Sequence, residues 1–227
     1  MHKILAVCCI SLCTITEVWA DTYTDMQQEC IKIAMENPPQ VEVKYNYGQL
    51  KINNELDEKQ LQKFHYEMTR ETAENLNGLT SLQPSIVLDG LNNMDVRELP
   101  NGYLCLFPTT LKVKIEYMPV VYILKDIAKG TCKYNLTLRH EYTHIDIAYA
   151  AMNLVVMAFK KQLPAIAFKT SVKAVLPEDA VNVSTQMNEQ YQAQASQIWD
   201  LFRQVLDEQH KKLDVHDTYA RETAMCK

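Results

Sequence analysis

Five consecutive residues, His140-Glu141-Tyr142-Thr143-His144, have the types and the spacing that metal-assisted hydrolysis requires. Histidines four positions apart lie one turn apart on the same face of a helix, so both imidazoles can bind a single metal ion. A zinc ion held in this way lowers the pKa of a bound water, and a neighbouring carboxylate can take its proton so that the hydroxide attacks a carbonyl. The segment therefore predicts Zn²⁺ bound by His140 and His144, with Glu141 as the general base.

Chance is a weak explanation for this HExxH pattern. The chain has six histidines and sixteen glutamates among 227 residues. At these frequencies about 0.01 matches are expected at random. Leu136, Ile147, Ala151 and Leu154 extend an apolar face near the two histidines, which indicates a helix. Two other interpretations stay open: a structural metal site, or two core histidines without a metal.

The third zinc ligand is less clearly marked. The metzincin pattern HExxHxxGxxH is excluded, because Ile147 stands in place of its glycine and Ala150 in place of its last histidine. A gluzincin would instead take a glutamate from a later helix, and Glu189 is the candidate for that role.

Helical phase in the last part of the chain favours a histidine over this glutamate. Glu189 belongs to a polar stripe, whereas His210 continues an apolar one. The polar stripe comprises Glu189, Ala193, Ser196, Asp200, Arg203 and Asp207, and the apolar stripe comprises Ala195, Trp199, Phe202, Leu206 and His210. We therefore predict that Glu189 points outward and that His210 points inward as the third ligand.

The residues near His210 leave alternatives. Asp214, one turn later, is placed to hold the other ring nitrogen of His210. Asp214, His216 and Asp217 are also alternative ligands themselves, and an aspartate ligand would resemble the aspzincins. A further alternative is that His210 ends the helix and interacts with its terminal carbonyl groups.

Beyond residue 130 the pattern is helical. A long helix is expected over residues 132–161, with Pro164 ending or kinking it, and a second helical stretch is expected as far as Val175. A proline followed by two acidic residues at 177–179 is typical of a helix start. That last helix is expected to run to about Leu213.

The first part of the chain mixes strands with one helix. Residues 41–52 alternate apolar and polar side chains around a break at Gly48, which predicts a β-hairpin. Apolar residues at three- and four-residue spacing predict an amphipathic helix over residues 57–75, with Asp57 near its start. Short strands are expected at residues 85–88, 103–107, 111–117 and 120–124.

These elements predict an α+β fold. A small N-terminal β-sheet with one helix is expected to pack on a helical C-terminal half that carries the HExxH helix. Residues 21–227 are long enough for one domain. We expect a mixed part at residues 21–130 and a helical part with the zinc site at 131–227.

Residues 1–20 have the features of a signal peptide. A short basic start precedes an apolar stretch, and small residues surround Ala20, so the mature chain is expected to begin near Asp21 in the periplasm or outside the cell. No apolar run is long enough for a membrane span. A net charge of −5 with both signs scattered along the chain gives no basic stripe for nucleic acid.

Four of the seven cysteines lie beyond the signal, which suggests two disulfides in an oxidising compartment. None of the four forms a C-x-x-C pair. Of the three possible pairings, we favour Cys105 with Cys132 and Cys30 with Cys226.

The HEYTH segment resembles the zincin metallopeptidases. This resemblance implies their fold, in which a sheet packs on the active-site helix, a second helix supplies the last ligand and substrate lies along an edge strand. It also implies that His140 and His144 bind zinc and that Glu141 is the base. Residues 104–147 are similar to uncharacterised exported HExxH proteins of Gram-negative bacteria. The similar segments include Phe107-Pro108-Thr109, Val120-Val121-Tyr122 and Gly130-Thr131-Cys132.

The function expected from the sequence is therefore an exported zinc-dependent metallopeptidase that hydrolyses peptide bonds in a peptide or protein substrate. The strand at 111–117 or the strand at 120–124 is expected to pair with the extended substrate. One alternative is a non-catalytic cell-envelope protein with a structural zinc site. The other is a metal-free binding module that keeps a degenerate zincin core.

Overall fold

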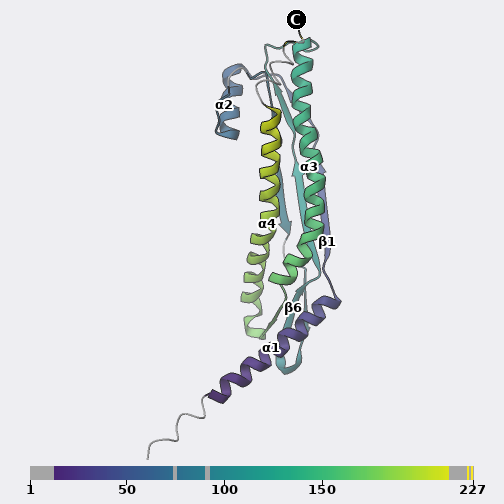
Figure 1. The fold of residues 1–227 in the computed structure, drawn as a ribbon, viewed down its shortest axis with the longest axis vertical. Helices are drawn as coiled ribbons and strands as arrows, with labels where there is room; N and C mark the ends of the chain where they lie inside the picture. Colours follow the sequence, from purple (N-terminus) through teal and green to yellow (C-terminus); the bar gives the residue numbers. More distant parts are fainter. Residues whose placement is uncertain (1–12, 74–75, 90–92, 215–223, 225, 227) are drawn as a thin grey trace, which may run out of the picture. The chain divides into compact units, whose positions relative to one another are not determined.

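The computed structural model describes residues 13–73, 76–89, 93–214, 224 and 226 of the chain. Within them helices and small sheets alternate, which confirms the predicted α+β class (Figure 1). The α-helices are α1 (Cys13–Glu36), α2 (Glu58–Thr69), α3 (Cys132–Thr170) and α4 (Ala180–Leu213). The strands are β1 (Gln40–Tyr47), β2 (Lys51–Asn53), β3 (Gly78–Ser81), β4 (Ser85–Asp89), β5 (Met94–Glu98), β6 (Leu104–Pro108), β7 (Thr110–Tyr117), β8 (Val120–Ile123) and β9 (Lys173–Val175). Two 3₁₀ helices cover Pro100–Gly102 and Pro177–Asp179.

The chain divides into two compact units, each made of three separate segments. Unit 1 comprises Met1–Glu42, Asp89–Lys112 and Lys160–Ala195, and unit 2 comprises Val43–Leu88, Val113–Phe159 and Ser196–Lys227. These units do not follow the expected division at residue 130, because α3 and α4 each contribute residues to both.

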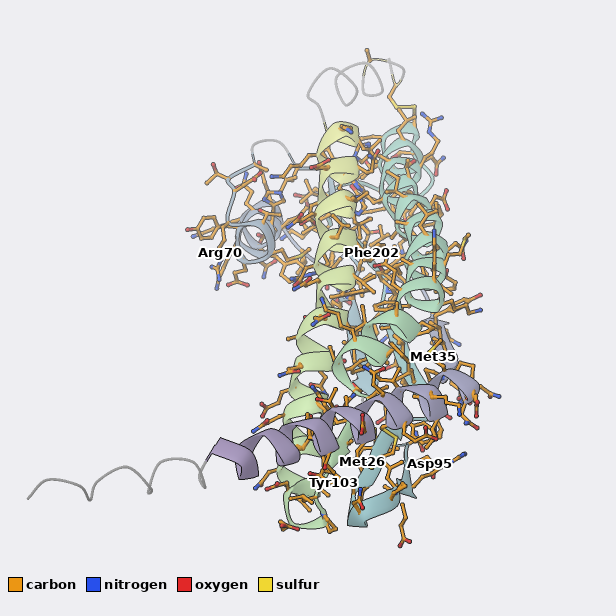
Figure 2. All side chains as sticks on the ribbon, turned by 60° about the horizontal axis from the view of Figure 1, so that its bottom comes forward. Met26, Met35, Arg70, Asp95, Tyr103 and Phe202 are labelled. Carbon is orange, nitrogen blue, oxygen red and sulfur yellow. A yellow bond between two sulfur atoms is a disulfide. The ribbon has the colours of Figure 1, made fainter. Side chains whose placement is uncertain are left out.

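Unit 1 contains a helix that the sequence analysis did not predict. Helix α1 runs through the expected cleavage point after Ala20 and continues to Glu36. Met26, Cys30 and Ala34 recur every four residues, and all three are buried in a cluster with Tyr103 (Figure 2). The side chain of Gln27 joins α1 to β9, because its Nε2 donates to the carbonyl of Val172 and its Oε1 accepts from the amide of Ala174.

The two disulfides correct the pairing expected from the sequence. Cys30 of α1 is bonded to Cys105 of β6, and Cys132 at the start of α3 is bonded to Cys226. The expected pairing overlooked α1, which packs against β6 and brings the Cα of Cys30 to 5.2 Å from that of Cys105. Two disulfides fit a protein that folds in an oxidising compartment.

In unit 2, the small sheet β2-β8-β3 replaces the hairpin that was expected over residues 41–52. Strand β2 pairs in parallel with β8, and β1 belongs to another sheet with the order β1-β7-β4. Gly48 separates the two strands, and its amide donates to the carbonyl of Tyr117 at 2.8 Å. A Cβ on Gly48 would lie only 2.6 Å from that oxygen. The break at Gly48 is therefore a close backbone approach and not a hairpin turn.

Strands β7 and β8 are central strands of their sheets. Leu111, Val113, Ile115 and Tyr117 of β7 are all buried, which confirms the predicted alternation. Because β7 lies between β1 and β4, and β8 lies between β2 and β3, each strand is already paired on both sides. The expectation that one of them pairs with a peptide substrate is therefore wrong. The edge strands of the β8 sheet are β2 and β3.

Helix α2 begins as predicted but ends earlier. Asp57 caps its start: the Asp57 carboxylate accepts from the amide of Gln60, whose side chain accepts from the amide of Asp57. The helix ends at Thr69, because Arg70 adopts a left-handed conformation with φ of 62°. This end lies well before residue 75.

Helices α3 and α4 differ from the expectation mainly at Pro164. This proline lies inside α3 and does not end it, since Leu163 and Ala167 on either side are fully buried and hold the helix in place. After Thr170 the chain forms strand β9 where a helical stretch was expected. In α4, the predicted phase is confirmed, because Glu189 is exposed and Trp199, Phe202 and Leu206 are buried. Among the described residues, no helix is long and apolar enough to cross a membrane.

Candidate metal centre

Helix α3 presents the three motif residues to the interior of unit 2. His140 is 4% exposed, Glu141 3% and His144 8%. The helix is fixed here by its apolar face, because Tyr134 and Ile145 pack in one buried cluster with Val121 and Ile123 of β8. This packing fixes the direction in which the two imidazoles point.

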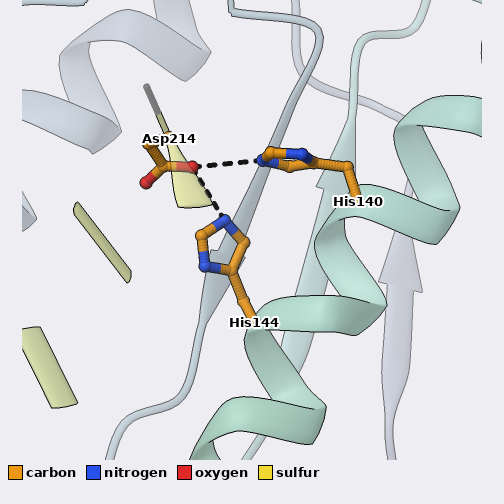
Figure 3. Close-up of side chains that lie close together, drawn as sticks. All are labelled: His140, His144 and Asp214. Carbon is orange, nitrogen blue, oxygen red and sulfur yellow. Dashed lines mark hydrogen bonds and ion pairs between the residues drawn. The ribbon is translucent and has the colours of Figure 1, made fainter. Parts of the chain in front are cut away.

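Asp214 joins the two histidines. It lies directly after α4, which ends at Leu213, and its Oδ1 is 3.1 Å from His140 Nε2 and 3.0 Å from His144 Nε2 (Figure 3). The Asp214 side chain is 53% exposed, in contrast to the two buried rings. The carboxylate therefore faces the rings on one side and solvent on another.

The three side chains fit a metal ion. One ligand atom from each of His140, His144 and Asp214 lies within 4.8 Å of the others. Two ligand atoms on one tetrahedral zinc are about 3.3 Å apart when each zinc–ligand bond is about 2.0–2.1 Å. The observed separations of 3.0 and 3.1 Å are close to that value. Two imidazoles and a carboxylate are also ligands that zinc accepts.

His210 lies next to the site but on the other side of His144. Its Nδ1 is 2.8 Å from the Nδ1 of His144, whereas Asp214 meets the Nε2 of the same ring. Its own Nε2 is buried and has no hydrogen-bond partner within the described part of the chain. Burial, together with the nearby His144 ring, lowers the pKa of His210 to about 4. His210 thus points inward as predicted, and its role as a zinc ligand stays a prediction.

The other candidates for the third ligand were Asp214, His216 and Asp217 in the tail and Glu189 on α4. Asp214 is brought to the histidines of α3, where it contacts the rings of His140 and His144. Burial alone would raise the pKa of Asp214, but hydrogen bonds with these two rings outweigh it and lower that pKa. His216 and Asp217 lie outside the described residues. Glu189, the gluzincin candidate, is exposed on α4.

Two residues of strand β3, Gly78 and Thr80, lie next to Glu141, and neither was predicted from the sequence. The Thr80 hydroxyl lies 2.8 Å from Glu141 Oε2 and 3.0 Å from the Glu141 carbonyl oxygen, and it is the donor to both. A Cβ on Gly78 would lie 2.6 Å from Glu141 Oε1. Gly78 and Thr80 alternate with Leu79 and therefore share one face of the strand. Such a short alternation has no distinctive pattern in the sequence.

The surroundings of Glu141 favour a carboxyl group that accepts a proton readily. Burial raises the pKa of Glu141. Three nearby groups lower it, namely the rings of His144 and His140 and the hydroxyl of Thr80, but the effect of burial is larger. A carboxylate beside a metal-activated water needs a raised pKa to act as a base near neutral pH. Glu141 is thus a buried carboxyl group with a raised pKa next to the cluster of His140, His144 and Asp214.

Comparison with known proteins identifies no family for this chain. No family model, no curated protein and no solved structure matches the chain. The function is therefore inferred from the chain's own residues.

Proposed function

We propose that the chain is an exported zinc-dependent metallopeptidase, with His140, His144 and Asp214 as zinc ligands and Glu141 as general base. One observation supports this proposal above the others: a single Asp214 oxygen lies close to the Nε2 atoms of both His140 and His144, and the buried Glu141 lies beside them. Zinc bound there supplies Lewis acidity that lowers the pKa of a water. With zinc bound, the Glu141 carboxylate would accept the proton of that water as the water attacks the carbonyl carbon of the scissile bond, and it would then pass the proton to the leaving amine.

The exposure of Asp214 favours a catalytic site over a structural one. A structural zinc is enclosed by four protein ligands, whereas a catalytic zinc has three protein ligands and an open position. Among the residues that the structure describes, three donors cluster, one of them on a side chain that is 53% exposed, and this set fits the second arrangement.

Strand β3 is the best candidate to bind the substrate backbone. It forms an edge of the sheet β2-β8-β3, and the Thr80 side chain on it contacts Glu141. An extended peptide that adds to this edge forms backbone hydrogen bonds and brings a carbonyl close to the general base. The resemblance of the HEYTH segment to zincins supports the same arrangement.

The test is the conservative variant Glu141→Gln. It should retain one equivalent of zinc, because Glu141 is not a ligand, and it should lose turnover of denatured casein and of a mixture of internally quenched peptides by at least about 100-fold. Glu189→Gln is the matched control, since the same change at an exposed position of α4 should leave both unchanged. Full activity in Glu141→Gln would contradict the mechanism. Wild-type protein that binds zinc but cleaves neither substrate would favour the structural site.

A further inference from the structure

The ring of His144 makes two polar contacts with different partners. Its Nε2 lies 3.0 Å from Asp214 Oδ1, and its Nδ1 lies 2.8 Å from His210 Nδ1. The rings of His144 and His210 are tilted by 48°, with centroids 4.9 Å apart. His210 thus contacts the edge of the His144 ring that faces away from Asp214.

The protons on the two rings must be arranged in one of two ways. A neutral imidazole carries a proton on one nitrogen and a lone pair on the other. Two Nδ1 atoms 2.8 Å apart form a hydrogen bond only when one of them carries the proton and the other does not. Either His210 donates to His144, or His144 donates to His210.

Metal binding selects between these two arrangements. A metal ion takes the lone pair of a neutral imidazole nitrogen, so an ion on His144 Nε2 requires the His144 proton to be on Nδ1. His144 Nδ1 then donates to His210 Nδ1, which must accept with its lone pair. His210 carries its own proton on Nε2. Both rings stay neutral, and no net proton is gained or lost by the pair.

Without a metal ion, the opposite arrangement satisfies the contacts. His210 donates from Nδ1 to His144 Nδ1, and His144 donates from Nε2 to Asp214. If His144 Nε2 instead presented its lone pair to the Asp214 oxygen, two electron-rich atoms would face each other at 3.0 Å with no proton or cation between them. With both rings neutral, the two states therefore differ by a tautomer change in both rings.

We infer that His210 is a positioning residue and not a zinc ligand: its Nδ1 accepts a hydrogen bond from His144 Nδ1 and so directs the lone pair of His144 Nε2 toward the metal position beside Asp214. The roles expected for His210 and Asp214 are thereby exchanged. Such partners of a ligating histidine are usually carboxylates or carbonyl groups, and their loss weakens metal binding by about 10–100-fold. This inference rests on the zinc site of the proposed function but not on its peptidase activity.

Nitrogen NMR of the histidine rings tests the inference directly. Long-range ¹⁵N–¹H spectra of the full chain, with and without one equivalent of Zn²⁺, report which ring nitrogen is protonated and which is bound to metal. Signals are assigned with His144→Gln and His210→Asn. We expect zinc on Nε2 of His144, protonated Nδ1 of His144 and protonated Nε2 of His210 in the loaded protein. In the metal-free protein, the protons of both rings should occupy the opposite nitrogens.

Zinc affinity, measured by competition with a chromogenic chelator, is the second readout. His210→Leu removes the acceptor and should weaken binding by about 10–100-fold while the stoichiometry stays at one. His210→Asn keeps an acceptor oxygen near the position of Nδ1 and should restore most of the affinity. The visible spectrum of Co²⁺-loaded His210→Leu should keep the wild-type shape, whereas Asp214→Ala should alter it, because Asp214 is a proposed ligand and His210 is not.

The outcomes separate the inference from the proposed function. Zinc on a nitrogen of His210, or a changed cobalt spectrum in His210→Leu, would overturn the inference and restore His210 as a ligand. Wild-type protein that binds no zinc would overturn the inference and the proposed function together. Zinc binding with the expected tautomers, but without cleavage of casein or quenched peptides, would overturn the peptidase function alone.

Discussion

Gly78→Ala should destabilise the protein and displace Glu141, because the added methyl group has no room. Its Cβ would lie 2.6 Å from Glu141 Oε1 and 2.7 Å from Thr137 Cγ2, whereas ordinary van der Waals contact begins at 3.4 Å. Overpacking of this kind costs about 1–3 kcal/mol. The lower backbone freedom of alanine in the unfolded chain returns about 0.4–1 kcal/mol. We therefore expect the free energy of unfolding to fall by about 1–2 kcal/mol.

Urea unfolding of the metal-free protein, with its disulfides intact, measures this cost. The same substitution in a Glu141→Ala background should cost less by about 1 kcal/mol, because Glu141→Ala removes the nearest of the clashing atoms. Gly48→Ala is a matched control. Its Cβ would lie equally close to the backbone oxygen of Tyr117, which no side-chain change can relieve. Gly48→Ala should therefore destabilise the protein without coupling to Glu141.

Activity gives the second half of this test. In Gly78→Ala the zinc stoichiometry should stay at one, because Gly78 contacts the base and not the ligands, while turnover of casein should fall by about 10-fold or more. If Gly78→Ala leaves stability and turnover unchanged, then strand β3 does not confine Glu141. An equal cost of Gly78→Ala in both backgrounds would lead to the same conclusion.

Three further predictions concern the support of the site and of unit 2. Thr80→Val should lower the free energy of unfolding by about 1–3 kcal/mol and reduce turnover, because Glu141 loses its hydroxyl donor. Thr80→Ser keeps the hydroxyl and should restore most of the stability and the turnover. Equal defects in the two variants would show that the hydroxyl has no role. Cys226→Ser should lower the free energy of unfolding by roughly 4–5 kcal/mol, since the bond to Cys132 spans 94 residues. The variant should also bind zinc more weakly. A thermal unfolding curve identical to that of the wild type would contradict this expectation. Asp57→Ala should cost about 1 kcal/mol through loss of the capping box of α2, measured by urea unfolding, and zinc affinity should stay as in the wild type.

The sequence was most informative where a periodic pattern was long. The alternation over 111–117 gave strand β7 almost to the residue, and the phase of α4 correctly separated exposed Glu189 from inward-facing His210. The sequence was least informative where a short segment depends on a distant partner. Strand β3 has only Gly78–Ser81, and its pairing with β8 cannot be read from four residues. The hairpin expected at Gly48 failed for the same reason, since β2 pairs with β8 far along the chain.

Helical phase alone could not choose between His210 and Asp214 as the third candidate ligand. Phase pointed to His210, the last residue of the apolar stripe, and placed Asp214 one turn later, just after α4 ends at Leu213. The structure brings Asp214 to both motif histidines just after the helix has ended. The amide of Asp214 still donates to the carbonyl of His210, as in a helix. Which of these two residues reaches the Nε2 atoms depends on where the end of α4 lies relative to α3, and phase within one helix does not determine this.

The disulfide at Cys132 lies in the same unit as the candidate metal centre. Cys132 begins the same helix that carries both motif histidines, and His140 follows it by about 12 Å along the helix axis. Its partner Cys226 follows Asp214 by about a dozen residues. The bond joins Cys226 to the start of α3 and closes a loop that contains both α3 and α4. Its reduction removes this constraint from the unit that holds His140, His144 and Asp214. If the proposed zinc site is correct, the protein should bind zinc more weakly after its disulfides are reduced.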